Sequence, residues 1–248
     1  MVAAEWKRLK NPLKLRELVD EVWVYGDRSV HDPIATGEAP PALTDRIRFT
    51  GYLAHGRADA PVGDAGLAHN PPFILTTTGG GSDGMELLRA AVAIDVPEGY
   101  QHLVVTGPQL DEDAVAEIQA LAGPRTVVYQ SLPGLVEHIE NASAVIAMGG
   151  YNTVCEILAT DTPGLIVPRE HPRLEQLIRA RAMEAAGATE LMRFDAVSTD
   201  ALTAWVADAV TRRADRSHIE LEGLNVTAHY AAELLQRTAA PELAGASA

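Results

Sequence analysis

Three short segments of this sequence carry residue types that could bind a phosphorylated ligand, and the first is a glycine-rich turn at residues 78–84. Glycines between a strand and a helix let backbone N–H groups approach a phosphate, and the helix N-terminus adds partial positive charge. The turn therefore predicts an anion site. The alternative is a tight strand-to-helix turn in which Ser82 or Asp83 caps the helix.

The second segment, residues 147–156, repeats the order of strand, glycine turn and helix start. Two such turns in one sheet favour a ligand at the carboxyl ends of the strands, where open α/β sheets bind. Glu156 follows the second turn by about one helical turn, so its carboxylate could point back and accept both hydroxyls of a ribose. A favourable interaction with the helix dipole is the alternative role of Glu156.

The third segment, residues 167–176, follows another predicted strand and places polar residues at the start of a helix. Side chains with several donors and acceptors suit the recognition of sugar hydroxyls. Arg169 or Arg173 could also neutralise a diphosphate in an otherwise acidic protein. The alternative is a solvated loop held by ion pairs.

Gly79, Gly81 and Gly84 also satisfy the spacing of the dinucleotide-binding fingerprint. That fingerprint requires an acidic residue about 20 positions further on, at the end of the next strand, to hold a ribose. The next predicted strand ends at residues 105–108 without an acid. An NAD-binding oxidoreductase is therefore the alternative and not the main interpretation.

Short β-rich runs alternate with longer stretches that carry apolar residues at helical spacing, which is typical of βα units around a parallel sheet. Strands are predicted at residues 21–25, 46–49, 73–77, 102–106, 126–129, 144–148 and 164–167, and helices at 85–93, 113–121, 132–139, 153–159, 173–186, 199–210 and 219–236. The predicted fold class is α/β, with a Rossmann-like parallel sheet flanked by helices.

Composition excludes several classes of protein. Of the 248 residues, 47% are hydrophobic and 22% are charged, which excludes disorder, collagen and coiled coil as descriptions of the whole chain. A net charge of −14 repels phosphate backbones, so we expect no nucleic-acid partner. The single cysteine, Cys155, excludes an intramolecular disulfide and a cysteine-built zinc site. We expect a cytoplasmic protein that reaches the inner membrane face only through a partner or a further domain.

The predicted domain organisation has four parts. Residues 57–72 are rich in Gly, Ala, Asp and Pro without periodicity, and we expect a loop or linker there. Residues 1–56 before it are interpreted as the remnant of an N-terminal domain with an interdomain segment. Residues 73–237 are the predicted Rossmann-like domain, and residues 238–248 a flexible tail.

Taken together, the three segments resemble the C-terminal, nucleotide-sugar-binding domain of the GT-B glycosyltransferases of family 28, the MurG-like group. The resemblance spans about residues 20–210 and includes a Met-Gly-Gly-Tyr-Asn-Thr-Val-Cys-Glu block at residues 148–156 and a Pro-Arg…Glu-Gln block at residues 168–176. It implies the C-terminal half of a GT-B fold.

The resemblance also implies a role for each block in binding a donor. The first glycine turn would face the donor diphosphate and the acceptor, the second would line the phosphates, Glu156 would hold the ribose, residues 131–132 would read the base through their backbone, and residues 175–176 would contact the sugar. Where the MurG-like enzymes have two glutamines, this chain has Glu175 and Gln176. The predicted donor-binding residues are Gly80, Gly81, Ser82, Asp83, Gly84, Ser131, Leu132, Gly149, Gly150, Tyr151, Asn152, Thr153, Glu156, Arg169, Glu175 and Gln176.

The implied activity is an inverting hexosyltransferase that uses a UDP-sugar and needs neither a metal nor another cofactor. An acceptor hydroxyl would attack the anomeric carbon, and helix N-termini would stabilise the departing nucleotide diphosphate. Most of the acceptor domain, where the general base is expected, is outside this chain. An engineered fragment, a truncated gene model and a split enzyme with a separate acceptor-binding chain each explain this. A non-catalytic sugar-nucleotide-binding subunit is a further alternative.

Overall fold

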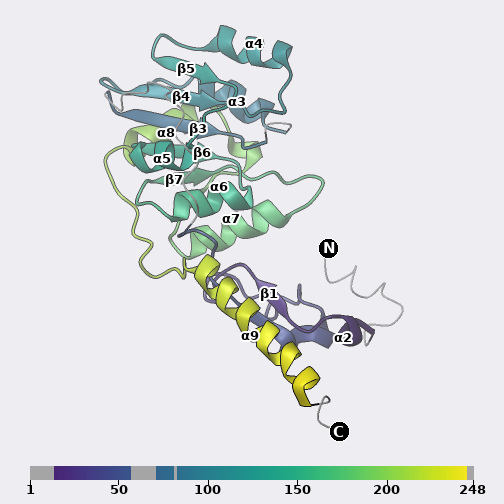
Figure 1. Cartoon of the computed structure of the whole chain (residues 1–248). Helices are drawn as coiled ribbons and strands as arrows, with labels where there is room; N and C mark the ends of the chain where they lie inside the picture. The colour runs from purple at the N-terminus through teal and green to yellow at the C-terminus, as the bar shows by residue number, and fades with distance from the viewer. Residues whose placement is uncertain (1–13, 57–70, 81–82, 245–248) are drawn as a thin grey trace. The chain divides into compact units, whose positions relative to one another are not determined.

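The computed structural model describes residues 14–56, 71–80 and 83–244 (Figure 1), and it divides into two compact units. One unit comprises Met1–Arg57 and Ile219–Ala248, and the other comprises Ala58–His218. The predicted linker lies outside the described residues except at positions 71–72. None of the described helices combines the length and the apolar character that a bilayer span requires.

Six parallel strands form the sheet of the second unit in the order β5-β4-β3-β6-β7-β8. From β3 the chain builds outward to β5, returns to the centre, and builds outward again from β6 to β8. The point where this order reverses lies between β3 and β6, and open α/β sheets bind ligands at such a point. The strands are β3 (Phe73–Thr77), β4 (Gln101–Val105), β5 (Thr126–Tyr129), β6 (Ala144–Ala147), β7 (Gly164–Ile166) and β8 (Glu190–Leu191).

Helices cover both faces of this sheet (Figure 1). On one face α3 packs against α4 and α8, and on the other α5 packs against α6. Because both faces are covered, the central strands β3 and β6 are buried along their whole length. The helices are α3 (Met85–Val92), α4 (Glu112–Leu121), α5 (Leu135–Asn141), α6 (Tyr151–Leu158), α7 (Glu175–Ala185) and α8 (Thr199–Ala209).

The predicted α/β class and parallel sheet are confirmed, and the differences concern where some elements begin or end and one short strand that was not predicted. Helix α5 begins three residues later than predicted, since Gly134 has a left-handed backbone with φ of 70° and stops the helix from starting earlier. Strand β8 was not predicted, because two residues are too few to show periodicity.

The first unit contains a parallel pair of short strands, β1 (Val22–Val24) and β2 (Ile47–Phe49), at the positions predicted. Helix α9 (Gly223–Ala244) belongs to this unit, whereas we predicted that the Rossmann-like domain would extend to residue 237. The Tyr230 hydroxyl donates to the Phe49 carbonyl at 3.0 Å, which explains the assignment of the helix. Its last turns reach Ala244, within the predicted tail. The unit also contains α2 (Lys14–Leu18) and the 3₁₀ helix η1 (Pro41–Arg46).

A buried histidine in the central sheet predicts acid sensitivity. His102 on β4 is fully buried, with Nε2 2.8 Å from the Thr76 hydroxyl, and burial lowers the pKa of His102 to about 3. The unfolded chain takes up this proton near pH 6.5 and the folded chain does not, so stability falls as the pH drops from about 6.5 towards 3. Between pH 7.5 and 4.5 we expect His102 alone to remove about 2.5 kcal/mol from the free energy of unfolding.

The free energy of unfolding, measured by urea denaturation of wild type and His102→Gln at the two pH values, tests this prediction. The acid-induced loss should be smaller in the variant by that amount, while His218→Gln, which removes an exposed histidine, should keep the wild-type loss. Equal pH dependence in wild type and His102→Gln would contradict the prediction.

Candidate functional site

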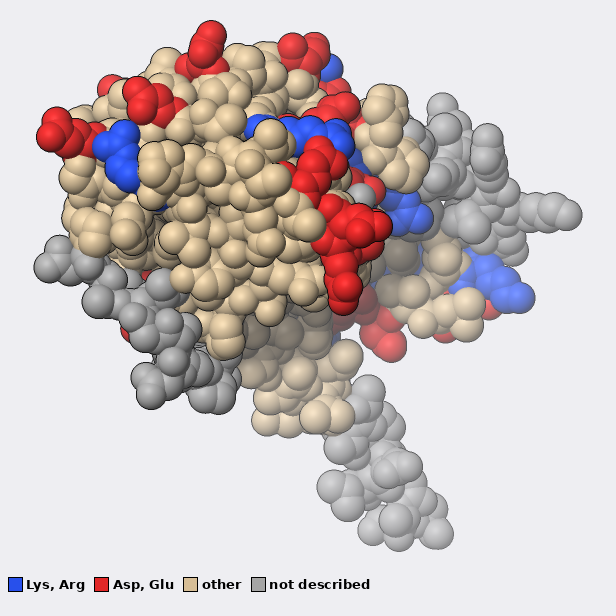
Figure 2. Space-filling model, turned by 90° about the horizontal axis from the view of Figure 1, so that it is seen from above, with Lys and Arg blue, Asp and Glu red and all other residues tan. Residues whose placement is uncertain are grey.

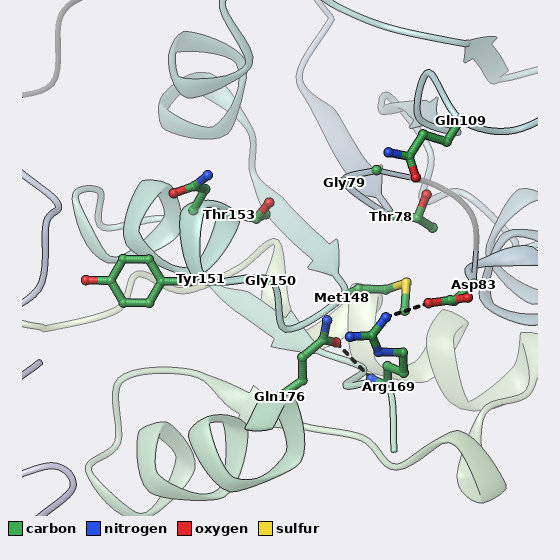
Figure 3. A pocket seen from close by; sticks show the side chains of 12 residues that line it. Thr78, Gly79, Asp83, Gln109, Met148, Gly150, Tyr151, Thr153, Arg169 and Gln176 are labelled. Atoms are coloured by element: carbon green, nitrogen blue, oxygen red, sulfur yellow. Dashed lines mark hydrogen bonds and ion pairs between the residues drawn. The ribbon is translucent and has the colours of Figure 1, made fainter. Parts of the chain in front are cut away.

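A pocket of about 470 Å³ opens at the carboxyl ends of the central strands (Figure 3), within the size range of small-molecule sites. The turn after β3, the loop after β4, the turn after β6 and the loop after β7 all contribute to it. The pocket therefore lies at the switch point between β3 and β6. Its lining residues are Thr78, Gly79, Gly80, Asp83, Gln109, Met148, Gly150, Tyr151, Asn152, Thr153, Arg169 and Gln176.

Hydrogen bonds from the loop after β4 fix the turn after β3. The Thr78 hydroxyl donates to the Thr106 carbonyl at 2.7 Å, and the Gln109 N–H donates to the Gly80 carbonyl at 3.1 Å. The side-chain oxygen of Gln109 lies 3.4 Å from where a Cβ on Gly80 would stand. A side chain at position 80 would therefore crowd Gln109, and glycine lets these two loops meet.

The N-terminus of α6 is open towards the pocket. Its N-cap, Gly150, supplies no capping side chain, and its first turn contains no acidic residue. Helix N-termini leave N–H groups without intrahelical partners and carry partial positive charge, so this end suits an anion. Thr153 is only 8% exposed, yet it lines the pocket. This end of the pocket offers donors to a ligand.

An arginine fixes the backbone of this second turn. Nη1 of Arg179 donates to the Gly149 carbonyl at 2.6 Å, and its guanidinium lies 5.4 Å from the centre of the Tyr151 ring. Both contacts come from α7, one helix further along the chain. They hold the turn in place from a side chain, Arg179, that does not itself line the pocket.

The loop after β7 brings one cation into the pocket. Nη1 of Arg169 donates to Asp83 Oδ2 at 2.7 Å and Nη2 donates to Glu175 Oε1 at 3.1 Å, while the Arg169 N–H donates to Gln176 Oε1 at 3.0 Å. The hydrogen bond that Arg169 donates to Asp83 is the largest cause that raises the pKa of Arg169 above its ordinary value. Such pairing is common on this acidic protein: on the face in Figure 2, Lys and Arg side chains lie beside Asp and Glu side chains.

The structure brings all three predicted segments to one pocket. Gly81 and Ser82 lie outside the described residues. The predicted residues that line the pocket are Gly80, Asp83, Gly150, Tyr151, Asn152, Thr153, Arg169 and Gln176; those that do not are Gly84, Ser131, Leu132, Gly149, Glu156 and Glu175.

Two of the glycines that do not line the pocket have packing roles. A Cβ on Gly84 would stand 2.4 Å from Thr78 Cγ2, so only glycine lets the end of the turn approach Thr78 at its start. A Cβ on Gly149 would stand 3.2 Å from Gln176 Cβ, so glycine lets α7 approach the second turn. Both positions shape the pocket without facing it.

Sequence reasoning missed four lining residues as members of the site: Thr78, Gly79, Gln109 and Met148. Thr78, Gly79 and Met148 adjoin predicted site residues and were within reach of the same pattern. Gln109 is different, because it follows a strand that carries no glycine-turn motif of its own. Only the pairing of β4 with β3 places Gln109 beside Gly80.

Solved structures with the same arrangement of elements are glycosyltransferases. The chain superposes on the glycotransferase of kitacinnamycin with a TM-score of 0.62 at 18% identity, covering 95% of this chain and 65% of that one. It superposes on MurG of Acinetobacter baumannii with a TM-score of 0.60 at 17% identity, covering 91% of this chain and 63% of that one. The fold is that of GT-B glycosyltransferases.

Within this class, residues 74–224 match the glycosyltransferase family 28 C-terminal domain. This range is more than half of the 248 residues, and the chain belongs to this family. Membership confirms the resemblance drawn from the three segments, and it favours a glycosyltransferase over the NAD-binding alternative.

Curated relatives include the UDP-N-acetylglucosamine–N-acetylmuramyl-(pentapeptide) pyrophosphoryl-undecaprenol N-acetylglucosamine transferases of the two bacteria named next. That of Corynebacterium efficiens is 31% identical over 156 residues, covering 58% of this chain and 39% of the relative. That of Agrobacterium fabrum is 28% identical over 194 residues, covering 71% of this chain and 50% of the relative. The chain thus spans half or less of the length of these relatives.

Proposed function

We propose that this chain is the donor-binding part of a glycosyltransferase and that its pocket holds a nucleotide-diphospho-sugar, with UDP as the expected nucleotide. The observation that carries the proposal is the open N-terminus of α6, which faces the pocket at the switch point of the sheet. A diphosphate fits an uncapped helix end that has no carboxylate in its first turn. The names of the curated relatives support a UDP-sugar as the donor.

Residues that line the pocket and three predicted residues outside its lining, Glu156, Ser131 and Leu132, are proposed to divide the work of binding. We expect the diphosphate to accept hydrogen bonds from the first N–H groups of α6, from the Thr153 hydroxyl and from the backbone of Gly79 and Gly80. Glu156, half-buried on α6, is proposed to hold the ribose. Ser131 and Leu132, at the end of β5, are proposed to read the base through the backbone.

Sugar transfer in this site would be inverting. An acceptor hydroxyl would attack the anomeric carbon from the side opposite the diphosphate, the bond to the diphosphate oxygen would break, and that oxygen would take the electron pair. With the diphosphate at the N-terminus of α6, the first N–H groups of the helix would lie beside the oxygen on which this charge develops and would stabilise the leaving group without a metal. The base that takes the hydroxyl proton is proposed to lie in an acceptor-binding domain or chain.

A titration of the chain with UDP, GDP and dTDP by calorimetry tests the proposal. We expect UDP to bind most tightly, and Thr153→Val to weaken UDP about tenfold because one hydrogen bond to a charged group is lost. Thr189→Val is the matched control: Thr189 is buried as well, its hydroxyl lacks a partner among the described residues and it lies outside the pocket, so affinity should not change. Glu156→Ala should also weaken UDP, and full affinity in this variant would remove the ribose assignment. Failure of all three nucleotides to bind would refute the proposal.

A further inference from the structure

Asp83 and Arg169 are the only charged side chains among the described residues that line the pocket. They come from different loops, Asp83 from the turn after β3 and Arg169 from the loop after β7. Glu175 also accepts a hydrogen bond from Arg169, so two carboxylates share one guanidinium. The sum of these three charges is about −1, so the cluster as a whole does not attract an anion, although Nε of Arg169 is buried without a partner among the described residues.

This charge distribution separates the pocket into two ends. The α6 end carries backbone donors, the Thr153 hydroxyl and no carboxylate in the first helical turn. The other end carries Asp83 and Arg169, which Figure 3 shows together and apart from Thr153, and Gln176 lies between Gly150 and Arg169. A diphosphate beside Asp83 would meet like charge at short range, so it is favoured at the α6 end. The sugar of the donor is then left to the Asp83 end.

The Asp83 end has the hydrogen-bonding capacity that sugar hydroxyls need. The Asp83 carboxylate has room for about four hydrogen bonds, and the bond from Arg169 to Oδ2 is the one it makes among the described residues. Gln176 Oε1 accepts from the Arg169 N–H, which directs the amide NH₂ of Gln176 away from that contact as a donor. A hydroxyl both donates and accepts, so it can bond to the carboxylate and to the amide together.

We propose that Asp83, held in place by Arg169, is a specificity-determining residue that accepts hydrogen bonds from hydroxyls of a neutral donor sugar and disfavours sugars that carry a carboxylate. This inference rests on the proposed function of the pocket. Arg169 is then a positioning residue for Asp83 and does not neutralise the diphosphate, as the sequence had suggested it could.

Calorimetry with UDP, UDP-glucose and UDP-glucuronate tests this on wild type and on Asp83→Asn. Wild type should bind UDP-glucose about tenfold more tightly than UDP-glucuronate, since the uronate places a second carboxylate near Asp83. Asp83→Asn should weaken UDP-glucose about tenfold, leave UDP within about twofold, and bring the two sugar nucleotides close to equal affinity. Retained UDP binding also shows that the variant is folded.

Two further variants separate the alternatives. Arg169→Gln should weaken UDP-glucose and leave UDP unchanged, because Arg169 acts on the sugar through Asp83. Glu117→Gln removes an exposed, arginine-paired carboxylate on α4, outside the pocket, and should change nothing. Tighter UDP binding by Asp83→Asn, or weaker UDP binding by Arg169→Gln, would show that Arg169 serves the diphosphate and would overturn the inference.

The two proposals fail in different ways. If wild type binds none of UDP, GDP and dTDP, the proposed function fails and this inference fails with it. If UDP binds but Asp83→Asn leaves the preference for UDP-glucose over UDP-glucuronate intact, only the role of Asp83 is overturned.

Discussion

Gly107→Ala should destabilise the α/β unit by about 3–5 kcal/mol and abolish tight UDP binding, because the new methyl group has no space. A Cβ at this position would stand 2.5 Å from the Gly79 carbonyl oxygen and 2.9 Å from the Gly80 carbonyl carbon. Both are backbone atoms of the turn after β3, so relief requires that turn to move. The backbone of Gly107 also has φ of 94°, which adds strain for any L-residue.

Gly99→Ala is the control that separates strain from collision. Gly99 has a similar φ of 82°, but nothing lies within 4 Å of the place its Cβ would take. Its replacement should cost only the backbone strain, about 1–2 kcal/mol, and leave UDP affinity unchanged. Urea unfolding and calorimetry measure both effects. Equal losses of stability and of UDP affinity in the two variants would mean that the close approach of Gly107 to the turn after β3 contributes to neither.

The sheet and the glycine turns were predictable because the signals for them are local. Alternating β-rich and helical stretches indicate parallel βα units, and a glycine turn between strand and helix indicates an open helix end. The structure confirms both, with β3 and β6 entering the two turns from the centre of the sheet. Given a parallel sheet, the carboxyl ends of its strands must share one edge, so the convergence of the three segments followed from the class of fold.

Contacts that depend on strand order were not predictable. Gln109 reaches Gly80 only because β4 lies beside β3, and Arg169 reaches Asp83 although 86 positions separate them in the sequence. Neither pair shows any spacing rule. The domain to which helix α9 belongs differs from the prediction for the same reason. The amphipathic pattern of the helix shows that one face is buried, but it does not show that the partner is β2.

Loss of the Arg216 side chain should cost the protein much of its stability. It is 5% exposed, and its guanidinium donates to the carbonyls of Ala188 at 2.8 Å, Thr160 at 2.6 Å and Thr162 at 2.9 Å. Burial lowers the pKa of Arg216 to about 10, so it is still charged at neutral pH. The three carbonyls lie in the segments that lead into β7 and β8, so one side chain fixes the entry of both strands.

Arg216→Met keeps most of the apolar stem and removes every donor. It leaves buried carbonyls without partners, and since each hydrogen bond to a charged group is worth about 1.5–3 kcal/mol, the total loss should be about 4–6 kcal/mol. Urea unfolding followed by circular dichroism measures it. Arg213→Met removes a side chain that is 60% exposed, with one ion pair at 3.9 Å, and should cost less than about 0.5 kcal/mol.

The conservative variant Arg216→Lys separates charge from geometry. Lysine keeps the positive charge but lacks the planar fork that reaches three carbonyls at once, so most of the loss should persist. Full stability in Arg216→Lys would show that charge alone is required. A loss below about 1 kcal/mol in Arg216→Met would show that the three carbonyls find other partners, and that β7 and β8 hold their places in the sheet without this side chain.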